Sequence, residues 1–394
     1  MMLEQREREE TGEQAGKVAE PPSVMASAKS AVRKRARPLM RASLIVLALL
    51  VLINVALQIN RRPFDIQSDG FWAYKRLATC ESLGRAPDVL FLGSSRTLYS
   101  ADAHQADNVM AQQFDHPTLS CNLGRMGASI ENDYYIFKRM VEDGYAPKLL
   151  IENLWENNLN VNADIPMDIQ GTNISQIVRL ADISDAPALS AHLGHYSAPS
   201  MADFLAQKAI PLYGDRVGIY HVICGSSHLG PCGVNTDEWD PETIKMYNQS
   251  DDRGWTAVSG YSLANVPPDK LQNDYMQLYG AIYKGIQHFQ IGGHQTDYLA
   301  KMVALAKAHG IKVALVVSPV APIYLKFFDA PNEWSVIMNY WQSFAQQHGV
   351  AFYDESLAPG YVPADFQDPH HLTASGAVKF STWMAHAIIA PALT

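Results

Sequence analysis

The longest apolar run in the chain lies near its N-terminus. Residues 42–58 carry no charged side chain and consist mainly of leucine, isoleucine, valine and alanine. As a helix, these seventeen residues span about 26 Å, close to the ~30 Å hydrocarbon core of a bilayer once flanking apolar residues are added. The pattern predicts a single transmembrane helix over residues 42–60.

A cleavable signal peptide and a buried core helix are the alternatives to a membrane anchor. A signal peptide lies at the extreme N-terminus and ends in a small-x-small cleavage site. Here about forty residues precede the apolar run, and its end, from Asn54 to Gln58, offers no good site. These features favour an uncleaved signal anchor.

Basic residues on the two sides of this run predict its orientation. Residues 29–41 contain six basic side chains and no acid, against Arg61, Arg62 and Lys75 soon after the run. Because basic residues tend to stay on the cytoplasmic side, the N-terminus is expected in the cytoplasm. We therefore expect a single-pass protein of a bacterial inner membrane. Residues 1–41 would form a disordered basic cytoplasmic tail, and the bulk of the chain would be periplasmic or extracellular.

Beyond the apolar run, short apolar segments alternate with segments of helical pattern. The predicted strands are 89–92, 118–123, 148–152, 311–319 and 350–354. The predicted helices are 68–83, 130–143, 294–309, 332–348 and 374–388. Apolar strands separated by helices indicate a parallel sheet covered on both faces. We expect a three-layer α/β/α domain over residues 68–394, with a parallel, flavodoxin-like sheet.

A long insertion interrupts this alternation between about residues 159 and 290, where proline, aspartate, asparagine and tyrosine recur. Insertions of this length in a compact α/β domain usually shape a substrate cleft. Its aromatic side chains would suit sugar stacking, although such residues more often belong to a core. Both interpretations stay open for Trp239, Tyr247, Trp255, Tyr261 and Tyr275.

A candidate nucleophile follows the first predicted strand, where the apolar run stops at Gly93 and delivers Ser94 and Ser95. Gly93 allows a tight turn that holds a hydroxyl at the carboxyl edge of the strand, and ligands bind at that edge in open α/β sheets. We interpret Ser95 as the nucleophile. A second Gly-Ser-Ser, residues 225–227, lies in the insertion between two cysteines and is interpreted as structural.

A base assembly for this serine lies near the C-terminus. A serine hydroxyl becomes a nucleophile when a base takes its proton, and the base works best when a carboxylate fixes its tautomer. Asp368 and His371 stand three residues apart just ahead of the last predicted helix, where one loop can carry both. The adjacent His370 is either a surface residue or a substrate contact. No metal is expected here, because no second cluster with ligand spacing accompanies the two histidines.

Three motifs together resemble the SGNH, or GDSL-type, hydrolase superfamily: Gly93-Ser94-Ser95, Asn122-Leu-Gly124 and Asp368-x-x-His371. The resemblance covers roughly residues 85–394. In that superfamily the serine follows a Gly-Asp pair, whereas position 94 is serine here. This departure resembles the membrane-anchored branch that includes alginate O-acetylation proteins and the teichoic-acid D-alanine transfer protein.

The resemblance implies acyl transfer by a triad of Ser95, His371 and Asp368. It also implies that the Gly124 N–H contributes to an oxyanion hole, with a purely conformational turn glycine as the alternative. Members of the superfamily commonly place an asparagine donor just beyond the third strand. Asn157 is the candidate for this donor, with Asn153 in the same segment as the alternative, and either residue could equally cap a loop.

The net charge and the cysteines of the chain restrict which partners it can bind and indicate the compartment in which it works. The net charge of the chain is −9, and the first sixty residues, with nine basic and six acidic side chains, contribute +3, which leaves −12 for the rest. Such a surface argues against a nucleic-acid partner, because phosphates need a compensating basic field. Cys224 and Cys232 bracket a loop with glycine and proline and are the favoured disulfide, while Cys80 and Cys121 are interpreted as buried thiols.

The expected function is acyl transfer or ester hydrolysis on an extracytoplasmic glycan, by an O-acetyltransferase or O-acetylesterase without a cofactor. Hydrolase and transferase remain alternatives. The expected partners are the membrane, a glycan or acyl ester and, for a transferase, a membrane-bound acyl donor protein. The competing hypothesis is a non-catalytic glycan-binding or scaffold subunit of a polysaccharide export or modification complex.

Overall fold

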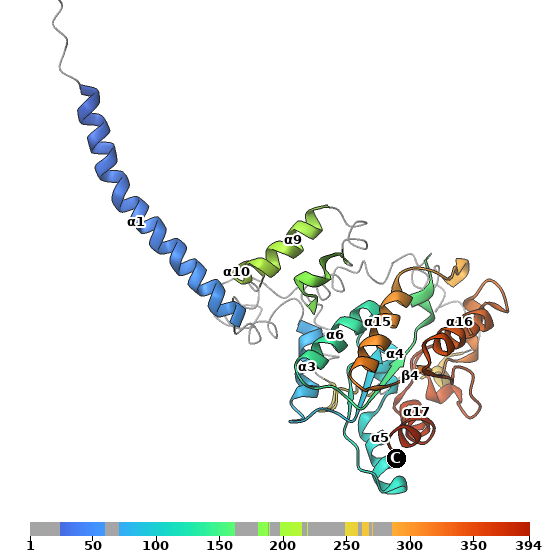
Figure 1. The fold of residues 1–394 in the computed structure, drawn as a ribbon. Helices are drawn as coiled ribbons and strands as arrows, with labels where there is room; N and C mark the ends of the chain where they lie inside the picture. The colour runs from blue at the N-terminus through green and yellow to red at the C-terminus, as the bar shows by residue number, and fades with distance from the viewer. Residues whose placement is uncertain are drawn as a thin grey trace, which may run out of the picture. The chain divides into compact units, whose positions relative to one another are not determined.

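The structure is a computed structural model of the whole chain. It describes residues 24–59, 71–161, 180–187, 189, 198–214, 219, 249–258, 262–267, 270 and 286–394 (Figure 1). The chain divides into two compact units, Met1–Ile59 and Asn60–Thr394, and each is described by itself.

The first unit contains one long helix, α1 (Val24–Ile59). Its stretch Met40–Ile59 has a mean hydropathy of 2.6, and its side chains are mostly exposed, which is the character of a membrane anchor or a signal sequence. The helix begins at Val24, upstream of the apolar stretch. Alanine, arginine and lysine, which favour helix, are frequent in residues 24–41.

The second unit is built on a five-stranded sheet in the order β2-β1-β3-β4-β5, and all neighbouring strands are parallel. The strands are β1 (Val89–Gly93), β2 (Ser120–Asn122), β3 (Leu149–Asn153), β4 (Lys312–Val317) and β5 (Ala351–Asp354). This is the flavodoxin-like strand order, which confirms the fold class predicted from the alternation of strands and helices. Every residue of β1 and β3 is buried, as expected for strands covered on both faces.

Two groups of helices pack around the sheet: α6 packs with α3 and α15, and α17 packs with α4 and α5 (Figure 1). Among the described residues of the second unit, the α-helices are α3 (Phe71–Glu81), α4 (Ser95–Ser100), α5 (Ala103–Phe114), α6 (Ile130–Glu142), α9 (Ala198–Ala209), α10 (Pro211–Gly214), α15 (Gln295–Ala308), α16 (Glu333–His348), α17 (Ala374–Met384) and α18 (Ala390–Leu393). A π-helical turn, Ala385–Ile389, joins the last two. The 3-10 turns are η1 (Glu156–Leu159), η2 (Ile183–Asp185), η3 (Leu263–Asn265), η4 (Ile286–His288), η5 (Pro322–Phe327) and η6 (Pro363–Asp365).

Side-chain caps set where several of these helices begin. Asp102, Ser129 and Thr373 each accept a hydrogen bond from the backbone N–H three residues on, at the start of α5, α6 and α17. Such caps satisfy N–H groups that have no partner inside the helix. The sequence pattern does not predict helices α4 and α5. Every residue of the six-residue α4 is buried, so it lacks the polar face by which a surface helix is recognised.

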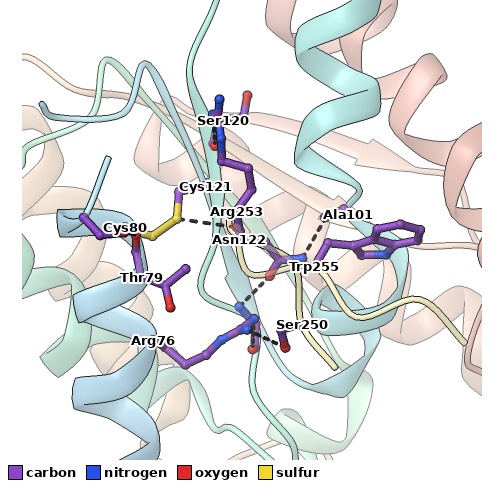
Figure 2. Close-up of a disulfide and its surroundings, with 12 residues drawn as sticks. Arg76, Thr79, Cys80, Ala101, Ser120, Cys121, Asn122, Ser250, Arg253 and Trp255 are labelled. Carbon is purple, nitrogen blue, oxygen red and sulfur yellow. Dashed lines mark hydrogen bonds between the residues drawn. A yellow bond between two sulfur atoms is a disulfide. The ribbon is translucent and has the colours of Figure 1, made fainter. Parts of the chain in front are cut away.

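A disulfide joins Cys80 of α3 to Cys121 of β2, with the two Cα atoms 5.7 Å apart (Figure 2). The interpretation of these cysteines as buried thiols is therefore wrong. Their proximity arises because α3 packs beside β2, a tertiary contact that the spacing of 41 residues does not reveal. The predicted pair, Cys224 and Cys232, lies outside the described residues, as does the second Gly-Ser-Ser.

Residues 249–258 of the insertion cover the outer edge of β2. The Asn122 N–H donates to the Arg253 carbonyl at 2.8 Å, and the Arg253 guanidinium donates to Asp107 and to the Ser120 carbonyl (Figure 2). Gly254, with φ +88°, passes so close that a Cβ there would lie 2.2 Å from the Asn122 carbonyl oxygen. An exposed sheet edge is a site for unwanted strand pairing, and this segment covers it.

Trp255 is the one insertion aromatic from the sequence analysis that falls among the described residues, and it belongs to the same segment. Its indole N–H donates to the Tyr99 carbonyl at 2.9 Å, so it anchors the insertion to α4. The remaining four aromatics, Trp239, Tyr247, Tyr261 and Tyr275, lie outside the described residues.

Candidate active site

Ser95 is the first residue of α4, directly beyond the carboxyl end of β1. Gly93 has φ +135°, and a Cβ there would lie 2.3 Å from Thr97 Oγ1 and 2.7 Å from the Asn153 carbonyl oxygen. Only glycine therefore fits this turn without a rearrangement. The Ser94 side chain accepts a hydrogen bond from the Arg96 N–H and caps α4. The turn thus presents Ser95 at the carboxyl edge of the sheet.

Ser95, His371 and Asp368 form one chain of hydrogen bonds. Ser95 Oγ lies 2.8 Å from His371 Nε2, although the two residues are 276 positions apart. On the other side of the ring, His371 Nδ1 lies 2.6 Å from Asp368 Oδ2. The second carboxylate oxygen, Oδ1, accepts the backbone N–H groups of His370 and His371 at 2.9 Å each. The structure therefore brings together the three side chains that the sequence analysis selected.

The electrostatics of this loop keep the aspartate ionised. Burial by itself raises the pKa of Asp368, but the electrostatic interactions and hydrogen bonds with His371 and His370 outweigh burial, so the pKa lies well below its usual range. An ionised Asp368 accepts Nδ1–H of His371 and leaves Nε2 as an acceptor for the serine hydroxyl. This is the tautomer that a general base needs.

His370 differs from its neighbour in its contacts and its charge. Its ring lies against Tyr324 at 5.5 Å and against His371 at 4.0 Å between ring centroids. Burial, followed by the nearby charge of His371, lowers the pKa of His370 to about 3. His370 is therefore a buried neutral packing residue and does not lie on the surface, which was one of the two expectations for it.

The Gly124 N–H, expected to face an oxyanion, donates instead to Asn122 Oδ1 at 2.7 Å. Asn122 also donates through Nδ2 to the carbonyls of Thr97, within α4, and of Ala101, which caps the C-terminal end of α4. A Cβ on Gly124 would lie 2.4 Å from the Leu98 backbone nitrogen, so glycine is needed here for the close approach of this turn to α4. Gly124 therefore allows the turn to pack against α4, the helix that begins with Ser95. Asn122 holds the turn and α4 together by its hydrogen bonds, a role that the sequence analysis does not predict.

Asn153 ends β3 and Asn157 lies in η1 just beyond it, and the hydrogen bonds of the two side chains differ. Asn153 Oδ1 accepts the Ser318 N–H at 3.1 Å, so this side chain is tied to the end of β4. Asn157 lies in η1, is buried, and its Oδ1 has no hydrogen-bond partner among the described residues. A buried polar atom without a partner is uncommon in folded proteins and calls for an explanation. An oxyanion needs a donor, and the donor without a partner in the described part of the chain is Asn153 Nδ2, whereas the unpartnered atom of Asn157 is an acceptor. Asn153 also pairs with Gly93, directly before the nucleophile turn, so it is the better candidate for the oxyanion donor than Asn157.

Two clusters of possible metal ligands occur in the part of the chain that the structure describes. The first is Asp368, His370 and His371, whose ligand atoms lie within 4.8 Å of one another, but whose Asp–His contact is the hydrogen bond described above. The second is His104, Asp251 and Asp252, in which His104 Nε2 lies 2.6 Å from Asp252 Oδ1. In both clusters a hydrogen bond already joins the histidine to an acid.

Comparisons with known proteins give a limited likeness. One protein-family model matches residues 287–392, which include the Asp368 loop and α15, α16 and α17. No curated protein matches the chain. The chain is similar to a crystal structure of a proposed acylhydrolase from Bacteroides fragilis, with 14% identity, a TM-score of 0.34, and coverage of 81% of this chain and 96% of that one. It is also similar to a GDSL-like lipase from Bacteroides thetaiotaomicron, with 15% identity, a TM-score of 0.34, and coverage of 83% and 100%. At these TM-scores the likeness adds nothing to what the side-chain geometry indicates.

Proposed function

We propose that the chain is an SGNH-type enzyme that transfers acyl groups through Ser95. The observation that supports this is the pair of contacts from His371, at 2.8 Å to Ser95 Oγ and at 2.6 Å to Asp368 Oδ2. A nucleophile within hydrogen-bond reach of a base, with the base oriented by a third group, is the arrangement used for acyl transfer.

In the first half-reaction, His371 Nε2 takes the proton of Ser95 as Oγ attacks the carbonyl carbon of an ester. The charge that develops on the carbonyl oxygen would be held by the Ser95 N–H and by the Asn153 Nδ2 amide. Loss of one donor of this kind typically costs about 10²–10³ in kcat. The ester C–O bond then breaks, the leaving alcohol takes the proton from His371, and the acyl group remains on Ser95.

In the second half-reaction, water or a sugar hydroxyl gives its proton to His371 and attacks the acyl carbonyl. The bond from Ser95 Oγ to the acyl carbon breaks, and Oγ recovers the proton from His371. Water as acceptor makes the enzyme an esterase, whereas a sugar hydroxyl makes it an acyltransferase. The same side chains perform both reactions, since only the acceptor differs.

The proposed substrate is an O-acylated glycan outside the cytoplasm, with the enzyme held at the membrane by residues 42–60. The apolar stretch of α1 supports the anchor. The Cys80–Cys121 disulfide suits an oxidising compartment such as the periplasm. The glycan follows from the motifs that resemble the polysaccharide-modifying branch of the superfamily.

The decisive experiment uses the purified full-length chain and a chromogenic acetyl ester, together with mass spectrometry after a short incubation with an activated ester. We expect turnover and an acyl adduct on Ser95, both lost in Ser95→Ala. Ser227→Ala, in the second Gly-Ser-Ser, is the matched control and should keep both. An adduct elsewhere, or full turnover in Ser95→Ala, would reject the proposal.

A second experiment distinguishes water from a sugar hydroxyl as the acyl acceptor, and both of these from a non-catalytic scaffold. An acetylated oligosaccharide incubated with the enzyme should either release acetate or pass acetyl to an added unacetylated oligosaccharide. Transfer that appears only with a membrane protein of the same cell would identify a separate acyl donor. Oligosaccharide binding without any Ser95-dependent chemistry would favour the non-catalytic subunit.

A further inference from the structure

We propose that Arg96, Glu156 and Tyr324 form a buried positioning network that holds the nucleophile, the Asn153 amide and the histidine loop in register. The inference rests on the proposed acyl-transfer function and assigns three residues that none of the motifs contains. None of the three has to touch substrate, so each acts through a neighbour.

Arg96 begins the network one residue after the nucleophile. Its Nη1 donates to Glu156 Oε2 at 2.7 Å, and its Nη2 donates to the Ser318 carbonyl at 3.0 Å. The side chains of Arg96 and Glu156 are 1% and 0% exposed. Arg96 follows β1, Glu156 follows β3 and Ser318 follows β4, and these strands are neighbours in the sheet. One guanidinium thus links the carboxyl ends of three adjacent strands.

Glu156 has both carboxylate oxygens engaged. Oε2 accepts a hydrogen bond from Arg96 Nη1, and Oε1 accepts one from the hydroxyl of Tyr324 in η5. Burial, followed by the charge of Glu156, raises the pKa of Tyr324 far above its usual range, so the phenol stays a donor. The network also reaches Asn153, because Ser318, whose carbonyl accepts Arg96, donates its N–H to Asn153 Oδ1 at 3.1 Å. These contacts hold the end of β3 that carries the Asn153 amide.

Tyr324 extends the network to the base. Its ring lies 5.5 Å from the ring of His370, which in turn lies 4.0 Å from the ring of His371. The backbone joins the same elements, since the Ala321 N–H donates to the Pro369 carbonyl at 2.8 Å. A shift of η5 would therefore move the loop that carries His371 relative to Ser95.

A purely stabilising role for this network is the competing explanation, and the burial of the ion pair argues against it. Removing two charges from water is costly, and replacing a buried ion pair by apolar residues of similar volume is often neutral or stabilising. A charged network that is replaceable for stability but fixes geometry should show its effect on turnover. A misplacement of about 1 Å at an active site can cost about 10²-fold in rate.

The test replaces the whole network by apolar side chains, Arg96→Met with Glu156→Leu and Tyr324→Phe, in the full-length protein. We expect a folded protein whose melting temperature is unchanged or higher and whose kcat for the acetyl ester falls about 100-fold. KM should change much less than kcat, because the change acts on the reacting geometry. A folded triple variant that keeps kcat within about twofold of wild type would overturn the inference, since the misplacement expected here costs far more.

Two single variants keep the inference testable if the triple variant does not fold. Arg96→Lys retains the charge but cannot donate to Glu156 and to the Ser318 carbonyl with one planar fork. Tyr324→Phe retains the ring against His370 and removes only the hydroxyl. Both should lower kcat with little change in KM, and unchanged kcat in both would contradict the proposal. Arg139→Met with Asp143→Leu, an ion pair of 2.9 Å at the far end of α6, is the matched control and should leave kcat unchanged.

The two proposals fail in distinguishable ways. If the wild-type protein shows no Ser95-dependent turnover, the proposed function fails and the network has no reaction to position. If turnover depends on Ser95 but the folded network variants retain wild-type kcat, the function stands and only the positioning role is rejected.

Discussion

Single side chains decide the chemistry of the carboxyl edge of the sheet. Gly93 and Gly124 permit two close approaches, one at the turn before Ser95 and one between the Gly124 turn and α4. His370 and His371 are adjacent in the chain, yet one is a packing residue and the other contacts Ser95. At the scale of single residues, little space is left around these groups, so substitution of one side chain should have a measurable effect of its own.

Gly124→Ala tests the close approach of the turn to α4. The added Cβ would lie 2.4 Å from the Leu98 backbone nitrogen, so backbone must move. Overpacking of this kind typically costs about 1–3 kcal/mol. Urea denaturation should show that loss, with reduced turnover because Ser95 lies on the displaced helix. Gly144→Asn, where a Cβ meets nothing within 4 Å, is the control, since asparagine tolerates positive φ. An equal loss in the two variants would contradict the steric explanation.

His370→Gln tests the buried neutral histidine through the pH dependence of stability. The pKa of His370 is about 3 in the folded protein and the ordinary value is 6.5, so between these values the unfolded chain binds a proton that the folded one does not. Stability is therefore lost as pH falls from 6.5 towards 3, by up to about 1.4 kcal/mol per pH unit from this group. Denaturation at several pH values should show a shallower acid slope in the variant. An unchanged slope would contradict the burial of a neutral ring.

Whole elements are held in place by contacts that lie beside the proposed site. The disulfide joins α3 to β2, and Asn122, the residue after Cys121, contacts both Arg253 and α4 (Figure 2). Arg76 of α3 adds hydrogen bonds to the Gly124 carbonyl and to Ser250. The edge strand, the turn and the insertion segment therefore form one packed unit.

Removal of the disulfide tests this unit. Cys80→Ser with Cys121→Ser should lower the free energy of unfolding by about 2–4 kcal/mol, because the crosslink restricts the unfolded chain. Denaturant unfolding of the oxidised wild type and the double variant measures the difference. Reduction of the wild type by dithiothreitol should reproduce the loss, while the double variant should not respond. Equal stability of the two proteins would contradict a formed disulfide.

At the scale of the whole molecule, the apolar helix and the α/β unit make separate contributions. The stretch Met40–Ile59 exposes its side chains and carries the composition of a bilayer-spanning helix. The α/β unit contains the sheet, the disulfide and every residue of the proposed site. Location and chemistry are therefore expected to be separable by mutation.

Substitutions in the helix test the proposed anchor. In the full chain, Leu47→Lys with Leu50→Lys places two charges near the centre of the apolar stretch, and each charge costs about 2.5–3.5 kcal/mol at the centre of an inserting helix. We expect the wild type in the carbonate-resistant membrane fraction and the variant shifted out of it. The matched control, Leu47→Ala with Leu50→Ala, changes the same two positions without adding charge and should leave fractionation unchanged. Identical fractionation of the wild type and the lysine variant would reject the anchor.

Local patterns in the sequence are sufficient to predict the strands, the order of strands and helices, the parallel sheet and the candidate nucleophile. Strand and helix periodicity, a turn glycine and the three-residue spacing of Asp368 and His371 are properties of short segments, so they can be read without the rest of the chain. Helix α4 escaped prediction because all its faces are buried, and burial on every side depends on neighbours that are remote in sequence.

Only the tertiary structure decided which groups are partners. The Gly124 N–H donates to the side chain of Asn122, two residues away, and Cys80 forms a disulfide with Cys121. Arg96 forms an ion pair with Glu156, sixty residues along the chain. The disulfide and the Arg96–Glu156 ion pair depend on distances of a few ångströms between separate elements, which arise when the helices pack on the sheet. The Gly124 hydrogen bond is local, but it depends on the turn conformation that packing against α4 imposes. The sequence therefore determined which chemistry was available, and the packing determined which atoms carry it.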